Sequence, residues 1–221
     1  MTIDATTVQM IIQGIWETLF MVFGSSLIAY LIGLPLGILL VVTKKGGIHP
    51  IPWLNAVLGI LINIFRSIPF IILLLMMIPV TRAIVGTTLG PGAVVPPLVA
   101  AAAPYIARVV ESSLSEVDAG VIEAAKSMGA STWQIIWKVL LPETKPSLIL
   151  GAALVITTIV GYSAMSGFVG GGGLGDIAIR YGYYRYQADM MIVTVIIMVI
   201  IVQLVQEIGN RLSRGTDKRI R

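Results

Sequence analysis

The sequence predicts an all-α integral membrane protein with five transmembrane helices and a pair of short helices between spans three and four. Of its 221 residues, 57% are hydrophobic and only 12% are charged, whereas soluble domains carry about 25% charged residues. The mean hydropathy is +0.94, and the apolar residues form runs long enough to cross a bilayer. Lys and Arg lie at the ends of these runs, as in other membrane proteins. We therefore expect one transmembrane domain over residues 1–221 and no large soluble domain.

Five apolar runs account for the expected spans, and the chain has no clear internal repeat. The first run contains Gly33, Pro35 and Gly37, which predict a kink or the close approach of another helix. The third is rich in alanine and proline, and neighbouring helices can satisfy the backbone groups that prolines free. The runs cover about residues 15–43, 53–79, 92–110, 146–168 and 190–208.

The basic residues orient these spans. With the N-terminus outside, ten Lys and Arg residues are cytoplasmic and three are outside; Arg66 and Arg108, in or at the edge of spans, are left out. The cytoplasmic set is Lys44, Lys45, Lys126, Lys138, Lys145, Arg211, Arg214, Lys218, Arg219 and Arg221, and the outer set is Arg82, Arg180 and Arg185. Because basic residues gather on the cytoplasmic side, the sequence predicts an outer N-terminus and a cytoplasmic C-terminus.

An odd number of spans argues against two inverted halves within one chain. Five helices interrupted by Pro and Gly could barely enclose a path for a small solute. A symmetric pair of chains would supply ten helices, so we expect a homodimer.

The stretch between the third and fourth runs is too polar and too broken to cross a bilayer, and it predicts two short cytoplasmic helices. Asp118 can cap the first, and Gly129 can end it because glycine adopts the left-handed conformation at little cost. Ser131 and Gln134 fit a capping box for the second, and Pro142 is expected to end it. The apolar faces would be Val121, Ile122, Ala125 and Met128 in the first helix and Ile135, Ile136, Val139 and Leu140 in the second. Periodicity alone also fits an amphipathic hairpin lying on lipid headgroups.

The residues of this stretch resemble the EAA loop of ABC importer permeases, which reads E-A-A, three residues, G, nine residues, I-x-L-P. The matching positions are Glu123, Ala124, Ala125, Gly129, Leu141 and Pro142. Val139 stands where the family prefers isoleucine and keeps a β-branched apolar side chain. The resemblance implies a type I ABC importer permease whose coupling helices, about residues 118–142, dock into a groove on a separate ATPase subunit. There Glu123 would pair with a basic residue, the two alanines would permit close contact, and Gly129 would make the bend.

Further segments are similar to the permease subunits of methionine ABC importers. They are N-I-F-R-S-I-P-F-I-I-L-L, A-A-P-Y-I-A-R-V-V-E and V-G-Y-S-A-M-S-G with G-G-G-L-G, between Asn63 and about Tyr186. The resemblance implies a multi-pass subunit of the bacterial inner membrane that imports methionine, in its L and D forms. Its partners would be a second copy, two ATPase subunits and an extracytoplasmic solute-binding protein. The chain has no GxxxxGK[ST] loop, so ATP and Mg are expected on the ATPase, and neither enzymatic activity nor a cofactor is expected in this chain.

Two groups of residues are candidates for the translocation path. Arg66, Ser67 and Pro69 lie in the second run, where a charged side chain is costly and points to function. Arg66 could instead anchor the span or contact the second copy. Pro69 frees the carbonyl of Phe65, which Ser67 or Arg66 could satisfy.

The second group, Tyr162, Ser163 and Met165, lies late in the fourth run. Small polar residues beside a polarisable methionine suit a weakly polar solute with a thioether tail, although they also suit plain helix packing. The resemblance implies that this span lines the path, and Met165 is the candidate gate.

Other activities fit the sequence poorly. The lack of cysteine excludes disulfides and thiol nucleophiles, and the single histidine, His49, excludes a multi-histidine metal site within one chain. G-Y-S-A-M departs from GxSxG at Met165. The segment 170–175 contains GxGxxG without a βαβ context, and we expect it to be a flexible connection or a surface for a solute-binding protein. The net charge is +4, and the basic residues lie at the ends of the spans. This placement indicates lipid headgroups as their partner and not nucleic acid.

The predicted function is that of the membrane-spanning subunit of an ATP-driven methionine importer. One alternative is an ABC permease for another amino acid or an osmoprotectant. Another is an ion-coupled secondary transporter, which would usually carry acidic residues in mid-span. Here Glu17 and Glu111 lie near the ends of runs.

Overall fold

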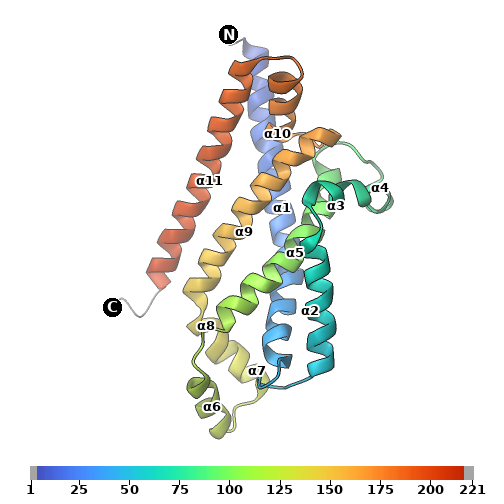
Figure 1. Ribbon diagram of the computed structural model, residues 1–221. Coiled ribbons are helices and arrows are strands. Elements are labelled where there is room, and N and C mark those ends of the chain that lie inside the picture. The colour runs from blue at the N-terminus through green and yellow to red at the C-terminus, as the bar shows by residue number, and fades with distance from the viewer. Residues whose placement is uncertain (1–3, 217–221) are drawn as a thin grey trace. The chain divides into compact units, whose positions relative to one another are not determined.

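The computed structural model describes residues 4–216, and the regular elements within that range are all helices (Figure 1). The α-helices are α1 Ala5–Thr43, α2 Pro52–Ser67, α3 Phe70–Met76, α4 Ile78–Val85, α5 Pro91–Leu114, α6 Ala119–Ser127, α7 Thr132–Ile135, α8 Leu141–Glu143, α9 Lys145–Met165, α10 Gly173–Ile177 and α11 Ala188–Thr216. One 3₁₀ segment, Ser166–Val169, and two π segments, Ile136–Leu140 and Ala178–Tyr183, connect some of them. Lys218, Arg219 and Arg221 of the predicted basic tail lie outside the described residues.

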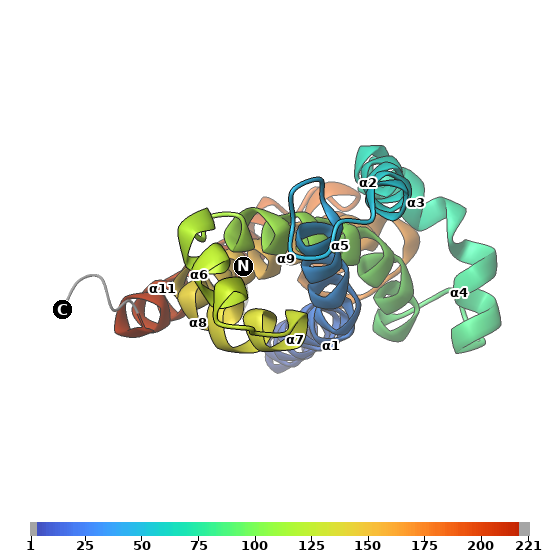
Figure 2. The same ribbon diagram turned by 90° about the horizontal axis from the view of Figure 1, so that it is seen from below.

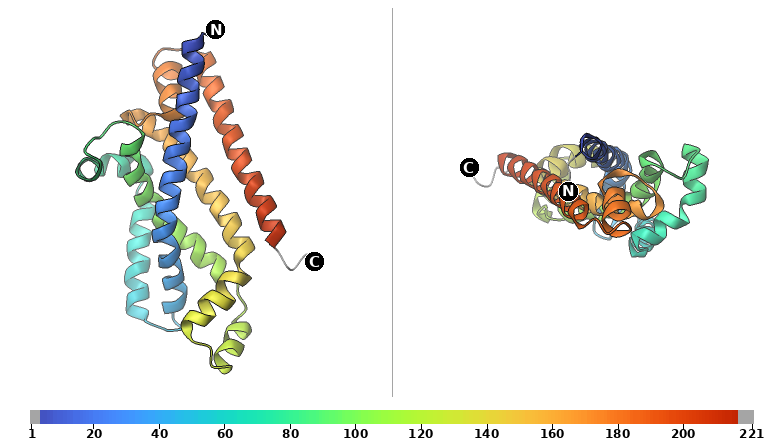
Figure 3. Two further views of the ribbon diagram at one scale, coloured as in Figure 1. Left: turned by 180° about the vertical axis from the view of Figure 1, so that it is seen from behind. Right: turned by 90° about the horizontal axis from the view of Figure 1, so that it is seen from above.

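The chain forms two compact units, each built from three separate stretches. Unit 1 takes in Met1–Ile28, Ile68–Ala102 and Ile156–Val205, and unit 2 takes in Ala29–Ser67, Ala103–Val155 and Gln206–Arg221. The long helices α1, α5, α9 and α11 each contribute residues to both units. Figure 3 shows the longest of them, α1, as one uninterrupted helix.

Within the described residues, four helices are long and apolar enough to cross a membrane: α1, α5, Lys145–Val169 and α11. The pair α2 and α3 passes the same test together, as one broken span or as a re-entrant segment. The all-α membrane class predicted from the sequence is confirmed, and the count reaches five if α2 and α3 are taken as one span. Helix α1 begins at Ala5, ten residues before the start of the predicted apolar run.

The run over residues 53–79 is interrupted at Pro69. Helix α2 ends at Ser67, and Pro69 adopts φ −56° and ψ 135° before α3 begins. Proline lacks an amide hydrogen and disfavours helical geometry in the residue before it, so the helix stops here. The chain between the second and third predicted runs is partly helical, because Pro79 fits the first turn of α4 and Gly86, at φ 81°, ends that helix.

The close packing predicted at Gly33 and Gly37 is confirmed within unit 2. A Cβ atom on Gly33 would lie 2.6 Å from the carbonyl oxygen of Ala103, and one on Gly37 would lie 2.6 Å from the Cβ of Val110. Only glycine therefore lets the second half of α1 approach α5 this closely. The neighbouring core consists of Leu40, Ile62 and Ala107, with Leu36 and Leu58 packed against it.

A hydrogen-bonded arginine joins α5 to α2 in unit 2. Arg108 Nη1 donates to Glu111 Oε2 at 2.6 Å. Its Nη2 donates to the carbonyl oxygen of Gly59 at 3.1 Å and to Asn63 Oδ1 at 2.9 Å. The side chains of Arg108 and Glu111 are each 25% exposed. A planar guanidinium can reach three acceptors at fixed angles, which a lysine ammonium cannot do.

The substitution Arg108→Lys is expected to lower the thermal unfolding midpoint of the detergent-solubilised chain by a few degrees. Lysine keeps the charge but cannot bond Glu111, Gly59 and Asn63 together, and the loss of one such bond costs about 1–2 kcal/mol. The matched control is Arg82→Lys on the exposed side of α4. Equal midpoints for the two variants would show that the fork of hydrogen bonds does not stabilise unit 2.

Candidate functional site

The stretch that carries the EAA-like spacing forms two capped helices in unit 2, α6 and α7. Asp118 Oδ1 accepts a hydrogen bond from the amide of Gly120 at 2.7 Å, which confirms the predicted N-cap. Gly129 adopts φ 78°, and its amide donates to the carbonyl of Lys126 at 2.9 Å. The predicted left-handed end of the first helix is therefore confirmed.

The capping box of the second helix is also confirmed. The amide of Gln134 donates to Ser131 Oγ at 3.3 Å, and the amide of Ser131 donates to Gln134 Oε1 at 2.8 Å. Both helix starts and the turn between them are thus fixed by local hydrogen bonds. Figure 2 shows α6, α7 and α8 next to one another.

The prediction that Pro142 ends the second helix is wrong. The backbone stays helical through the π segment and into α8, and the amide of Leu141 donates to the carbonyl of Ile136. Pro142 lies in the first turn of α8. Proline is tolerated there, because the first amides of a helix have no acceptor within that helix. The wider π turn lets the chain pass a proline that an uninterrupted α-helix would exclude.

The six residues of the EAA-like motif lie on this exposed end of the unit. Helix α6 has no buried residue. Glu123, Ala124, Gly129 and Pro142 are exposed, and Ala125 and Leu141 are half-buried. The Glu123 carboxylate makes no ion pair with any residue that the structure describes. It is therefore free to bind a positively charged partner.

The helix pair exposes large apolar side chains, of which the sequence analysis placed Val121 and Met128 on an apolar face but did not assign Trp133 and Trp137. Trp133 is 69% exposed and Trp137 is 63% exposed, and their spacing of four puts them on one side of the helix. Met128 is 86% exposed and Val121 is 46% exposed. The sequence did contain a signal for this surface, namely two tryptophans four residues apart and close to the motif residue Gly129. Exposed apolar groups of this size mark an interaction surface.

The opposite side of the second helix anchors it in unit 2. Ile135, Ile136 and Leu140 are buried, as the predicted apolar face requires. Lys126 Nζ also donates to the carbonyl oxygen of Gly47 at 3.2 Å, which ties α6 to the connection after α1. A force applied to the exposed residues would therefore be transmitted to the helices of this unit.

The candidate path residues fall in both units. Arg66 and Ser67 end α2 in unit 2 and are exposed, and Pro69 opens the third helix in unit 1. Ser67 Oγ donates to the carbonyl oxygen of Asn63 at 2.8 Å, not to that of Phe65. Tyr162, Ser163 and Met165 lie in the last turn and a half of α9. This end of the helix belongs to unit 1.

Within unit 1, the three α9 residues differ in their surroundings. The Tyr162 ring stacks on that of Phe70, with 4.6 Å between centroids and 7° between planes. Ser163 is buried, and its Oγ donates to the carbonyl oxygen of Val160 at 2.8 Å. Met165 is 43% exposed. Of the three, Met165 is the one with a side chain free to meet a solute.

The glycine-rich segment, for which a flexible connection or a surface for a solute-binding protein was expected, is hydrogen-bonded to α1 within unit 1. The amide of Gly173 donates to Glu17 Oε2 at 2.7 Å, and the amide of Leu174 donates to Thr18 Oγ1 at 2.9 Å. A Cβ atom on Gly172 would lie 2.7 Å from Glu17 Oε2. Glycine is needed both for this close approach and for the φ of 77° at that position.

Known proteins resemble this chain along nearly its whole length. It is 47% identical over 210 residues to the "Probable D-methionine transport system permease protein MetI" of Vibrio cholerae serotype O1, covering 95% of this chain and 93% of that protein. It is 47% identical over 181 residues to the methionine import system permease protein MetP of Bacillus subtilis, covering 82% of each. A chain from a structure of inward-facing conformations of the MetNI methionine ABC transporter superposes with a TM-score of 0.96 at 47% identity. That superposition covers 98% of this chain and 100% of the other.

The family described as "Binding-protein-dependent transport system inner membrane component" matches residues 33–221, which include the capped helix pair. Both curated relatives are transport permeases of similar length. The chain belongs to this family of inner membrane components of binding-protein-dependent transport systems.

Proposed function

We propose that this chain is the permease subunit of an ATP-driven importer that moves methionine into the bacterial cytoplasm. The observation that carries this proposal is the helix pair α6–α7, which is rigidly capped, exposed and apolar at its tip. The choice of methionine follows from relatives, because proteins 47% identical to this chain are described as methionine permeases. The chain supplies the membrane path and performs no chemistry on the solute.

The functional assembly contains two copies of this chain, two ATPase subunits and an extracytoplasmic solute-binding protein. ATP and Mg bind to the ATPase subunits. The whole chain forms one transmembrane domain with five spans, in which α2 and α3 together make the second. The N-terminus is outside and the C-terminus cytoplasmic, in keeping with the ten-to-three distribution of basic residues. This orientation puts α6–α7 on the side where ATP is available.

The helix pair docks into a groove of the ATPase. Glu123 pairs there with a basic residue, and Met128, Trp133 and Trp137 become buried. When two ATPase subunits close on ATP, each carries a docked pair with it. The burial of Ile135 and Leu140 couples that motion to the long helices, so the path opens alternately to the two sides.

Solute passes beside the end of α9 and the break between α2 and α3. Tyr162, Ser163 and Met165 supply small polar and polarisable groups to that path. Arg66, Ser67 and Pro69 mark the point where α2 ends and its backbone is no longer helical. Non-helical backbone at membrane depth is tolerated where it lines a water-filled cavity, which fits a path role for this break.

The substitution Met165→Ala is expected to raise solute leak or the basal ATP hydrolysis of the assembled transporter, because it removes the largest exposed side chain at the end of α9. Leak is measured as methionine efflux from preloaded proteoliposomes without ATP. Met76→Ala, which removes a side chain that is 62% exposed on α3, is the control. Wild-type leak and wild-type basal hydrolysis in Met165→Ala would remove Met165 as the gate.

Two measurements test the assignment. Affinity purification of the tagged chain should bring down an ATPase with a nucleotide loop and a solute-binding protein. The captured binding protein is then challenged with methionine and glycine betaine, and methionine should compete. Binding of glycine betaine without methionine would contradict the methionine assignment while leaving an ABC permease for an osmoprotectant. Recovery of the chain without an ATPase would contradict the importer itself.

A further inference from the structure

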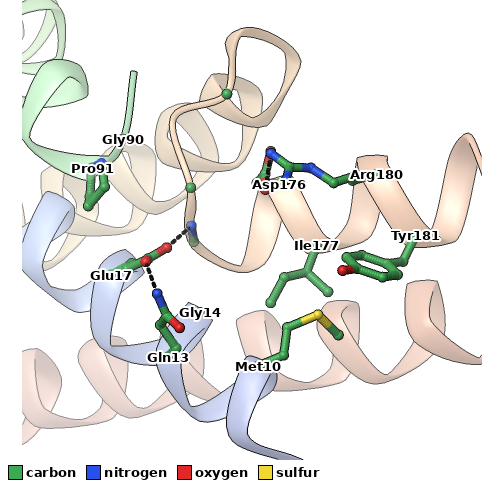
Figure 4. A pocket seen from close by; sticks show the side chains of 13 residues that line it. Met10, Gln13, Gly14, Glu17, Gly90, Pro91, Asp176, Ile177, Arg180 and Tyr181 are labelled. Atoms are coloured by element: carbon green, nitrogen blue, oxygen red, sulfur yellow. Dashed lines mark hydrogen bonds and ion pairs between the residues drawn. The ribbon is translucent and has the colours of Figure 1, made fainter. Parts of the chain in front are cut away.

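A polar cavity lies in unit 1 among the N-terminal part of α1, the start of α5, α10 and the π segment that follows it (Figure 4). Its volume is about 270 Å³. Sites for drug-sized ligands have about 300–1,000 Å³, so this cavity suits a ligand of amino-acid size. The side chains that matter for binding are Glu17, Asp176, Arg180, Met10, Ile177 and Tyr181.

The first wall carries the fixed, half-buried carboxylate of Glu17. Its Oε2 accepts a hydrogen bond from the amide of Gly173 at 2.7 Å, and its Oε1 accepts one from Gln13 Nε2 at 2.8 Å (Figure 4). A carboxylate has about four acceptor positions, so each oxygen can accept a further bond. Because the carboxylate is already ordered, a ligand ammonium would bind it with little loss of side-chain entropy.

The second wall carries an ion pair with donors to spare. Arg180 Nη2 lies 3.0 Å from the carboxylate of Asp176. Within residues 4–216, Nε and Nη1 of Arg180 make no hydrogen bond. The Nη1 amino group is therefore available to donate a charge-assisted hydrogen bond to a ligand carboxylate.

An apolar surface lies beside these charged groups. Figure 4 shows Met10, Ile177 and Tyr181 next to one another along one side of the cavity. The guanidinium carbon of Arg185 lies 4.5 Å from the centre of the Tyr181 ring, a cation–π contact that orients the ring. Methionine adapts its shape to an apolar neighbour, so Met10 can accommodate a flexible chain.

We propose that this cavity binds an α-amino acid with an unbranched apolar side chain. The ligand ammonium bonds to Glu17, its carboxylate bonds to Arg180, and its side chain packs on Met10 and Tyr181. The lining carries two carboxylates, Glu17 and Asp176, but only one guanidinium that the argument uses, Arg180, so the ligand ammonium offsets the excess negative charge. The inference rests on the proposed function, in which methionine is the solute and α1 begins outside. The cavity would then receive methionine at the outer mouth of the path.

The test is equilibrium binding of radiolabelled methionine to the purified transporter in nanodiscs, with variants made in this chain. Glu17→Gln keeps an oxygen for the Gly173 amide but loses the charge, and it should weaken methionine binding about ten- to a hundredfold. Arg180→Gln should weaken it by a similar factor. Arg82→Gln, on the exposed side of α4, should bind methionine as the wild type does. Competition then uses two analogues, methioninol, which lacks the carboxylate, and the analogue that lacks the amino group.

The analogues separate binding from folding. Glu17→Gln should leave the affinity for the desamino analogue unchanged, and Arg180→Gln should leave the affinity for methioninol unchanged. Wild-type methionine affinity in both variants would overturn the proposal, as would an equal loss for all three ligands, which indicates only a structural role. ATP-driven methionine uptake by the wild-type transporter is measured in parallel. The absence of uptake would overturn the proposed function. Uptake together with unchanged methionine affinity in both variants would overturn only the proposed binding site in the cavity.

Discussion

Replacing Gly129 by proline is expected to abolish ATP-driven uptake while leaving the chain inserted in the membrane. Gly129 adopts φ 78°, and proline fixes φ near −65°. The substitution also removes the amide that bonds the carbonyl of Lys126 at 2.9 Å. The turn between α6 and α7 would have to refold, at a cost of about 3 kcal/mol or more. The two helices would then no longer fit one rigid groove, and the ATPase should be lost on purification.

The control for this variant is Gly86→Pro. Gly86 is also an exposed glycine that ends a helix, with φ 81° and an amide bonded to the carbonyl of Arg82 at 3.0 Å. The same strain is therefore introduced on α4, which is not part of the docking surface, and ATPase recovery should be normal. Normal ATPase recovery with Gly129→Pro would contradict docking through the helix pair.

Glu123→Ala should weaken the docking of α6–α7 on the ATPase, because it removes the carboxylate that pairs with a basic residue of the ATPase. Truncating one member of a buried, hydrogen-bonded charge pair at an interface costs about 2–5 kcal/mol, so ATPase affinity should fall at least about tenfold. Glu207→Ala on α11 removes a carboxylate whose surface pair with Arg211 is worth little. The affinity is measured by titrating purified ATPase onto the reconstituted chain.

The second large effect is expected from adding a methyl group at Gly33 or Gly37. In each alanine variant the new Cβ would lie 2.6–2.7 Å from a backbone oxygen of α5. Backbone atoms cannot move aside as a flexible side chain can, so α1 and α5 must separate. Overpacking of this kind costs about 1–3 kcal/mol, and the double variant should lose most of its folded yield in detergent. The measurement is the monodisperse fraction on size-exclusion chromatography together with the unfolding midpoint.

Gly24→Ala on the same helix is the matched control. A Cβ at Gly24 would have no heavy atom within 4 Å, so the substitution adds a methyl group without a clash. Alanine is a better helix former than glycine by about 0.5–1 kcal/mol, so this variant should be as stable as the wild type or more so. Equal stability of Gly24→Ala, Gly33→Ala and Gly37→Ala would contradict the close packing of α1 on α5.

Features decided by near neighbours in the sequence could be predicted. The Asp118 cap, the left-handed Gly129 and the Ser131–Gln134 box each involve residues within a few positions of one another. Capping depends on such local hydrogen bonds, so the residue types alone indicate the geometry. The close approach at Gly33 was predictable for a different reason, because small residues mark helix contacts in membranes.

Features decided by distant contacts could not be predicted. Glu17 and Gly173 are 156 positions apart, and no local pattern indicates that one binds the amide of the other. The course of the chain through Pro142 depends on the π turn before it, which the burial of Ile136 and Leu140 accompanies. Trp133 and Trp137 were missed for a related reason, since apolar residues on a short amphipathic helix are expected to be buried until the structure shows them exposed.

The central claim is tested most directly by reconstitution. The purified chain is placed in proteoliposomes with its ATPase subunits inside and its binding protein outside, and uptake of radiolabelled methionine is followed. Uptake is predicted to require ATP in the lumen, to be lost without the binding protein, and to be indifferent to proton and sodium gradients. Methionine uptake driven by an ion gradient without the ATPase would contradict the account.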